Sequence, residues 1–346
     1  MKKNTYSLLF GKEPLESISR AAQTEKVIAD FSDELSLQQI YLITGIRGAG
    51  KTVFMTEISK SLCKDKNWIC VELNSGGDLL NDLAASLASE NQLAQIFKNA
   101  SINLSFFGIG LEVKEVVPIT NIQVAITKML ESLKKHKKRV LVCIDEVIGT
   151  QNMKLFASAF QIFVRQDLPI YLLMTGLYDN INNLQNEKNL TFLYRAPKID
   201  LKPLNIRTMA ENYQKVLNVD EAISLEMARL TKGYPFAFQV LGHFTWNHNG
   251  NYKAAIPEFR QYLEDYVYDK IWSELSGSDK KFLISVVKSG TGRAKDIKKL
   301  LSMADNEYSP YRDRLVKRGI LNGDEHGIVK FTLPLFNDYV SLKDEG

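Results

Sequence analysis

Residues Gly45-Ile-Arg-Gly-Ala-Gly-Lys-Thr52 decide the fold class of this chain. The glycines at positions 45, 48 and 50 allow positive φ angles, so the backbone N–H groups can turn inward around an anion. An apolar run at residues 40–43 precedes the stretch, and a helical pattern follows it. A loop between a strand and a helix N-terminus in this pattern is typical of polyphosphate binding.

Each residue of this loop has an expected role. We expect Lys51 to reach the β and γ oxygens of a nucleotide and to assist catalysis, and the Thr52 hydroxyl to ligate Mg²⁺. The predicted nucleotide-binding residues of the loop are Gly45, Ile46, Arg47, Gly48, Ala49, Gly50, Lys51, Thr52 and Val53.

Composition sets the broad class of the protein. The chain has 346 residues, 45% of them apolar and 24% charged, which predicts two or three domains of an ordinary globular protein. The net charge of +4 neither announces nor excludes a nucleic-acid partner. The first residues lack the apolar segment of a secretion signal, and no apolar run approaches a membrane span, so we expect a cytoplasmic protein.

The three cysteines, Cys63, Cys70 and Cys143, lie in apolar segments and lack the spacing of a metal or redox motif. We therefore expect buried free thiols in a reducing compartment.

Strands and helices alternate through the first half of the chain. Predicted strands at 40–44 and 68–73 are each followed by a helical pattern, which favours a parallel sheet with helical crossovers. Between about 100 and 116 the apolar residues instead alternate with period two around Gly108 and Gly110. This pattern predicts a β-hairpin inserted into the α/β core.

Two adjacent carboxylates, Asp145 and Glu146, follow the apolar run 140–144. The carboxyl ends of parallel strands meet at the edge where a phosphate loop lies, so these side chains are expected to face the same ligand. Asp145 is predicted to hold Mg²⁺, and Glu146 to polarise the water that attacks the γ-phosphorus. Two acids that simply leave a strand for solvent are the alternative.

Two further residues are weaker candidates. Thr175 ends another apolar strand, where its hydroxyl either contacts the γ-phosphate and the attacking water or only caps the strand. Arg195 either supplies positive charge to the transition state, in its own site or a neighbouring subunit's, or forms an ordinary surface ion pair.

The loop, the acid pair and Thr175, together with the Arg195–Leu204 segment and the Gly233-Tyr-Pro235 element, resemble the AAA+/STAND-type ATPases of prokaryotes. Within them, the chain is most similar to the group near the archaeal Orc1/Cdc6-like proteins. The resemblance implies ATP and Mg²⁺ as cofactors. It also implies that Pro235 and the lead-in at residues 10–14 and 18–20 lie against the nucleotide, although a helix broken by Gly and Pro explains 233–235 equally well. The arginine that such proteins carry near positions 236–242 is absent here.

The resemblance also implies a domain order: a P-loop ATPase core over 1–204, a helical lid subdomain over 205–272 and a winged helix-turn-helix over 273–346. In the last segment, three helical patterns and two short strands predict the winged helix. Its predicted third helix carries a basic set that suits DNA phosphates. That set comprises Arg312, Arg314, Lys317 and Arg318. However, the segment has thirteen Lys/Arg against eleven Asp/Glu, so docking to a protein partner stays open.

These observations predict an ATP-hydrolysing switch whose nucleotide state, bound between core and lid, repositions a C-terminal module on DNA or a partner. A nucleotide-dependent binding or scaffold protein with negligible hydrolysis is the alternative. A small-molecule kinase is disfavoured because the sequence offers no second acceptor site.

Overall fold

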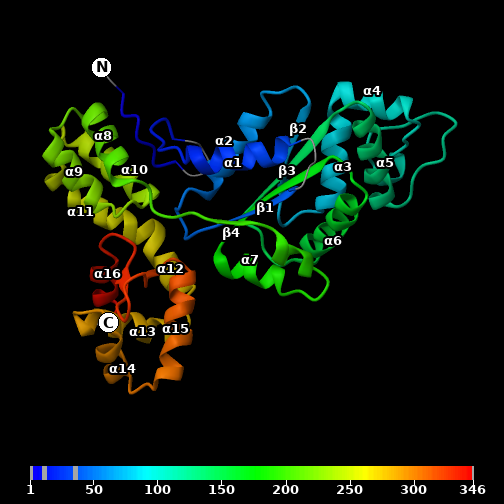
Figure 1. The fold of residues 1–346 in the computed structure, drawn as a ribbon. Coiled ribbons are helices and arrows are strands. Elements are labelled where there is room, and N and C mark those ends of the chain that lie inside the picture. The colour runs from blue at the N-terminus through cyan, green and yellow to red at the C-terminus, as the bar shows by residue number, and fades with distance from the viewer. Residues whose placement is uncertain (1–2, 10–13, 34–37, 345–346) are drawn as a thin grey trace. The chain divides into compact units, whose positions relative to one another are not determined.

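The computed structural model describes residues 3–9, 14–33 and 38–344, and they form two compact units (Figure 1). The sheet unit comprises Arg20–Thr44 and Lys51–Asp200. The helical unit comprises the N-terminal residues up to Ser19, the loop Gly45–Gly50 and the C-terminal part Leu201–Gly346. Within the described ranges, no helix combines the length and the apolar character needed to cross a bilayer.

The sheet unit is built on five parallel strands in the order β2-β3-β4-β1-β5. The apolar sequences of β1, β3 and β4 suit central strands that are covered on both faces. Because β1, β3 and β4 run in the same direction, their last residues reach one edge of the sheet. The strands are β1 (Ile40–Thr44), β2 (Trp68–Asn74), β3 (Arg139–Asp145), β4 (Ile170–Gly176) and β5 (Lys198–Asp200).

Helices cover both faces of this sheet (Figure 1). On one face, Leu42 and its even-numbered neighbours on β3 and β4 pack in one apolar cluster with residues of α3 to α7. On the other face, Phe31 of α1 packs against Tyr41 and Tyr171 with ring centroids 5.6 and 5.2 Å apart. The helical segments are α1 (Ala21–Ser32), α2 (Lys51–Leu62), α3 (Leu79–Ser89), α4 (Asn91–Asn99), η1 (Ser105–Phe107), α5 (Ile122–Lys135), α6 (Gln151–Arg165), α7 (Tyr178–Gln185) and η2 (Thr191–Arg195).

The predicted β-hairpin at 100–116 is wrong. The segment contains the short helix η1 and irregular backbone, with no strand among its residues. Its backbone is held by the buried Asn103, whose amide donates to the carbonyls of Val113 and Val116 at 3.2 and 2.7 Å. A side chain therefore takes over bonds that a ladder would supply, and the alternation of apolar residues reflects loop burial rather than strand pairing.

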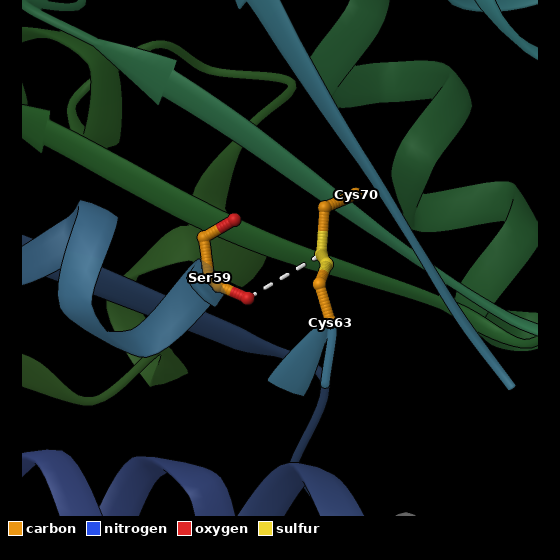
Figure 2. Close-up of a disulfide and its surroundings, with 3 residues drawn as sticks. All are labelled: Ser59, Cys63 and Cys70. Carbon is orange, nitrogen blue, oxygen red and sulfur yellow. Dashed lines mark hydrogen bonds between the residues drawn. A yellow bond between two sulfur atoms is a disulfide. The ribbon is translucent and has the colours of Figure 1, made fainter. Parts of the chain in front are cut away.

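The cysteines also depart from expectation. Cys63 and Cys70 form a disulfide with a Cα–Cα distance of 6.4 Å (Figure 2). Only Cys143, buried on β3, is a free thiol as expected. The pairing arises because the turn after α2 brings Cys63 back to β2, a proximity that spacing along the chain does not reveal.

The helical unit packs around a second apolar core. The N-terminal segment takes part in it: Tyr6 is 2% exposed and packs on Tyr213 of α8 and Phe238 of α10, with centroids 5.8 and 5.6 Å away. A methyl group on Gly242 would come within 2.6 Å of the Tyr6 ring, so only glycine allows this approach. The helices are α8 (Ile206–Leu217), α9 (Glu221–Leu230), α10 (Pro235–Asn247), α11 (Tyr252–Leu263), the π-helical η3 (Glu264–Tyr268) and α12 (Asp269–Ser273).

The C-terminal part contains the elements that the sequence predicts, three helices and a two-stranded antiparallel sheet, and a further helix, α16, that the sequence analysis did not predict. Residues 205–272 and 273–346 fall within one compact unit, so the predicted division between them stays a prediction. The elements are α13 (Gly277–Ser289), α14 (Ala294–Leu301), α15 (Asp305–Lys317), β6 (Leu321–Asn322), β7 (Lys330–Phe331) and α16 (Phe336–Leu342).

Candidate functional site

The carboxyl edge of the sheet brings Thr52, Asp145 and Thr175 into one hydrogen-bonded group. The Thr52 hydroxyl donates to Asp145 Oδ2 at 2.6 Å, and the Thr175 hydroxyl donates to Asp145 Oδ1. The Glu146 N–H also donates to Oδ1, at 3.0 Å. Both carboxylate oxygens of Asp145 are thus oriented, by residues from three different elements.

Thr175 lies beneath this group rather than open to solvent. It is fully buried at the end of β4, and its Oγ1 also accepts from the Glu146 N–H at 3.1 Å. Of the two roles predicted for Thr175, direct phosphate contact and strand capping, neither describes this arrangement fully. Its hydroxyl positions the two acidic residues.

Glu146 occupies an unusual backbone conformation. Its φ of +48° lies in the left-handed region, which costs a non-glycine residue about 1 kcal/mol or more. Bonds on both sides of the residue hold it there, since its carbonyl accepts from Ser75 Oγ at 3.2 Å. The side chain of Glu146 is exposed at the strand end, where a carboxylate can meet a bound molecule and its water.

Lys51 and Thr52 begin α2 in the sheet unit. Lys51 is 7% exposed at the first position of the helix, and it interacts with other residues of the protein. Neighbouring hydroxyl and carboxylate oxygens, as in the pair Thr52 and Asp145, are the hard ligands that Mg²⁺ prefers. No cluster of three or more His, Cys, Asp or Glu suited to a metal occurs in the described part of the chain.

The glycine loop itself lies within the helical unit. Gly48 and Gly50 have positive φ angles of +76° and +85°, as predicted for a loop whose N–H groups turn inward, whereas Gly45 does not adopt a positive φ. The Tyr234 hydroxyl donates to the Arg47 carbonyl at 2.6 Å, and the Arg47 guanidinium pairs with Glu274 at 3.1 Å. Burial raises the pKa of Tyr234 well above its usual range, so its hydroxyl remains a donor.

The Gly233-Tyr-Pro235 element starts α10 rather than breaking a helix. Pro235 is at the first turn, where its missing N–H costs nothing. Gly233 has a φ of +75°, and a methyl group there would lie 2.6 Å from the Leu204 carbonyl. A methyl group on Gly50 would lie 3.9 Å from Pro235, so the proline borders the glycine loop, and its predicted contact with a nucleotide stays a prediction.

Arg195 is not brought to the acid pair. It is exposed at the end of η2 and precedes β5, whose first residue Lys198 pairs with Leu42 of β1. It therefore approaches the sheet from the side of the strands' amino ends, whereas Asp145 and Glu146 lie at the carboxyl ends. An action of Arg195 on another subunit stays a prediction.

The lead-in is described in part. Residues 10–13 of the predicted 10–14 contact lie outside the described residues. Glu16 is held inside the helical unit, where its carboxylate accepts from Asn212 Nδ2 at 2.7 Å and its carbonyl accepts from the Gln239 amide. This segment packs on α8 and α10, and its predicted contact with a nucleotide base is not tested.

The three arginines of the basic set on α15 and at its C-terminal end are engaged within the protein. Arg314 donates twice to the carboxylate of Asp279, which is 1% exposed, and Arg318 reaches the same carboxylate at 3.4 Å. Arg312 donates to the Gly323 carbonyl at 2.7 Å and pairs with Asp313. Lys317, the fourth member of the set, is exposed.

Two residues of the candidate site were missed by the sequence analysis. Tyr234 lies between the glycine and proline of an element that the sequence analysis had identified. Its position next to the loop could therefore have been predicted. Ser75, which supports Glu146, follows β2 without a distinguishing pattern. Its role depends on the neighbouring strand, which only the fold supplies.

Comparison with known proteins bears on the fold of the chain. A family model described as a domain of unknown function (DUF8462) matches residues 265–340. No curated protein sequence matches the chain. Among solved structures, the Walker-type ATPase PABY2304 of Pyrococcus abyssi is similar, with 18% identity and a TM-score of 0.66 over 97% of this chain and 99% of that one.

Two archaeal proteins share the same fold. The ORC2 protein of Aeropyrum pernix, in ADPNP–ADP complexes, is 11% identical over 97% of both chains with a TM-score of 0.63. Cdc6p from Pyrobaculum aerophilum is 13% identical over 100% of this chain and 99% of that one, with a TM-score of 0.50. The chain therefore shares the fold of these ATPase, ORC2 and Cdc6p structures, which confirms the predicted fold class and, at the level of the fold, the predicted resemblance.

Proposed function

We propose that the protein binds and hydrolyses ATP with Mg²⁺, and that its nucleotide state acts on a C-terminal region that binds DNA or a protein partner. The observation that carries the proposal is the hydrogen-bonded group at the carboxyl edge of the sheet. Thr52, from the candidate phosphate loop, shares a 2.6 Å hydrogen bond with Asp145, next to the strained and exposed Glu146. The nucleotide complexes described for the ORC2 protein, which has the same fold, support ATP as the ligand.

In this proposal the loop Gly45–Thr52, with Val53 after it, binds the phosphates through backbone N–H groups and Lys51. Thr52 and Asp145 would hold Mg²⁺, which neutralises charge on the transferred phosphoryl group. Glu146 would orient the attacking water and accept its proton. Thr175 would keep both acidic residues in place.

The coupling of the nucleotide to the C-terminal region rests on contacts within the helical unit. Tyr234 and Glu274 both hold Arg47, a residue of the glycine loop. Pro235 borders the same loop and would lie against the nucleotide. A change of the loop on nucleotide binding would therefore reach α10 and α12 directly, and from them the C-terminal helices.

The decisive experiment compares phosphate release at saturating Mg·ATP by the native chain and by Glu146→Gln. Loss of the general base lowers kcat by roughly 10²–10⁴-fold, while thermal stabilisation by Mg·ATP persists. The matched control is Glu131→Gln on α5, an exposed acid outside the site, which leaves both unchanged.

A binding control completes this test. Lys51→Ala removes a cation from the anion site, which weakens Mg·ATP binding by about 2–3 kcal/mol, or roughly 30- to 150-fold in Kd. The matched change Lys135→Ala, at an exposed position of α5, has no effect. Equal turnover by native protein and Glu146→Gln contradicts the catalytic assignment. Stabilisation by Mg·ATP without turnover in either protein favours the scaffold alternative.

A further inference from the structure

The disulfide Cys63–Cys70 lies at the surface end of the sheet unit's α2. Cys63 is the first residue after that helix and is exposed, whereas Cys70 is the third residue of β2 and is half-buried (Figure 2). Their Cα atoms are 6.4 Å apart, within the range that a disulfide spans. An external thiolate can therefore approach the Cys63 sulfur while the Cys70 sulfur stays sheltered.

The fold also accommodates the reduced state. The Cys70 sulfur lies 3.6 Å from the Ser59 carbonyl, which is a hydrogen-bond distance for a thiol donor (Figure 2). A reduced Cys70 thus finds an acceptor on α2 without rearrangement of the helix. The Cys70 sulfur thus has a partner in the oxidised form, Cys63, and in the reduced form, the Ser59 carbonyl, which suits reversible oxidation and reduction.

Basic residues follow Cys63 along the chain. Lys64 and Lys66 lie in the exposed turn between the two cysteines, and Lys138 donates to the Lys66 carbonyl at 2.8 Å. The one acidic residue of this turn, Asp65, accepts from the Asn67 N–H at 2.9 Å. The two lysines give the turn a net positive charge, which attracts the anionic thiolate of a reductant.

We propose that Cys63–Cys70 is a reversible thiol–disulfide exchange site that accepts two electrons from a dithiol reductant. A thiolate of the reductant attacks Cys63 Sγ, the Cys63–Cys70 bond breaks, and Cys70 leaves as a thiolate that takes up a proton. The second thiol of the reductant, on losing its proton, attacks the mixed disulfide and releases Cys63 as a thiolate, which is protonated in turn. The protein gains two thiols and the reductant becomes a disulfide.

Cys143 provides an internal contrast. It is a free thiol that is 1% exposed on β3. It is therefore sheltered from reagents in the folded protein. The exchange site does not depend on the proposed ATPase activity. It does lie at the far end of the helix that begins with Lys51.

The experiment uses the full chain with Cys143→Ser, so that only Cys63 and Cys70 can form adducts with N-ethylmaleimide. The folded protein is treated with dithiothreitol or with glutathione disulfide, thiols are blocked with N-ethylmaleimide without denaturant, and intact mass is measured. We expect two adducts after dithiothreitol and none after reoxidation by glutathione disulfide, with far-UV circular dichroism unchanged. Peptide mapping of the oxidised form shows the Cys63–Cys70 crosslink.

Two results overturn the proposal. If adducts form only after unfolding, the bond is a sheltered structural crosslink rather than an exchange site. If two adducts form even in excess glutathione disulfide, the pair does not oxidise. The native chain with Cys143 present is the control for the substitution, and it gives the same two adducts because Cys143 does not react while folded. Neither result bears on nucleotide binding, so the two proposals fail separately.

Discussion

The carboxyl edge of the sheet and helix α15 both carry charged residues that the sequence predicts to be functional. They differ in how far other side chains of the protein bind these charges. At the sheet edge, hydroxyls and N–H groups orient Asp145, and the Glu146 side chain stays exposed. On α15, two arginines are bound by a buried carboxylate of the same unit, that of Asp279. A cluster of charged residues in a sequence therefore indicates a binding site only when those side chains are not already paired within the protein.

The physical difference lies in what each cluster leaves unpaired. Neutral hydroxyls fix the direction of Asp145 and do not cancel its charge, so it can still attract a cation. A buried carboxylate such as Asp279 needs cationic partners, because an uncompensated charge in the protein interior is costly. Arg314 and Arg318 meet that need, and the Arg314 guanidinium also stacks 5.0 Å above the ring of Tyr311.

The largest effect is expected from Asp279→Ala. This change removes the acceptor of two arginines and also the carboxylate that accepts from Ser276, the N-cap residue of α13, at 2.8 Å. Because the arginines are partly exposed and water can reach them, we expect a loss of about 3 kcal/mol, at the lower end for a broken buried pair. The Tm then falls by roughly 6–12 °C.

The control for this change is Asp313→Ala on the exposed side of α15, measured in the same thermal and urea unfolding experiments. We expect it to change the free energy of unfolding by less than about 1 kcal/mol. A native Tm for Asp279→Ala would show that the arginines do not depend on Asp279, and the contrast between the two clusters would not hold.

The same contrast explains how much could be predicted from sequence. The strands β1, β3 and β4 were predictable because their apolar runs are continuous and end in residues that suit the site. The hairpin at 100–116 was not, because alternation gives the faces of a segment but not the partner of its backbone groups, which here is the amide of Asn103.

Within the candidate site, sequence located Thr52, Asp145 and Glu146 through local motifs. It could not give the position of Thr175 beneath the acid pair, since that depends on the pairing of β3 with β4. The engagement of Arg314 by Asp279, thirty-five residues earlier, was hidden for the same reason. Long-range pairing decides which predicted residues remain available.

A smaller effect is expected at the sheet edge from Thr175→Val. Valine keeps the shape but removes the hydroxyl that holds Asp145 and the Glu146 N–H, so the two acids lose their common support. We expect kcat for ATP hydrolysis to fall roughly 10- to 100-fold, equivalent to about 1.4–2.7 kcal/mol, and the Mg²⁺ concentration for half-maximal rate to rise.

Thr175→Ser is the matched variant, because it restores the hydroxyl and loses only a methyl group. A positioning role predicts that serine recovers most of the rate and the native Mg²⁺ dependence. If valine and serine lower kcat equally while the Mg²⁺ dependence stays native, the buried methyl group matters rather than the hydroxyl, and the sheet edge loses its distinguishing feature.

The smallest effect concerns Lys317, the exposed member of the basic set on α15. If the C-terminal region binds DNA, Lys317→Ala removes about one phosphate contact, so the slope of log K against log salt changes by about 0.9 and affinity falls roughly eightfold at ~0.1 M salt. The Tm stays native, because the side chain is exposed. Arg314→Met is the comparison variant.

This change lowers the Tm by breaking the contact with Asp279, and its effect on the salt slope stays below that of Lys317→Ala. Fluorescence anisotropy with a mixed-sequence duplex at several salt concentrations measures both slopes. Equal slopes for the two variants at temperatures where both are folded would mean that Arg314 contacts DNA despite its internal partner, and α15 would then resemble the sheet edge more than its bonding suggests.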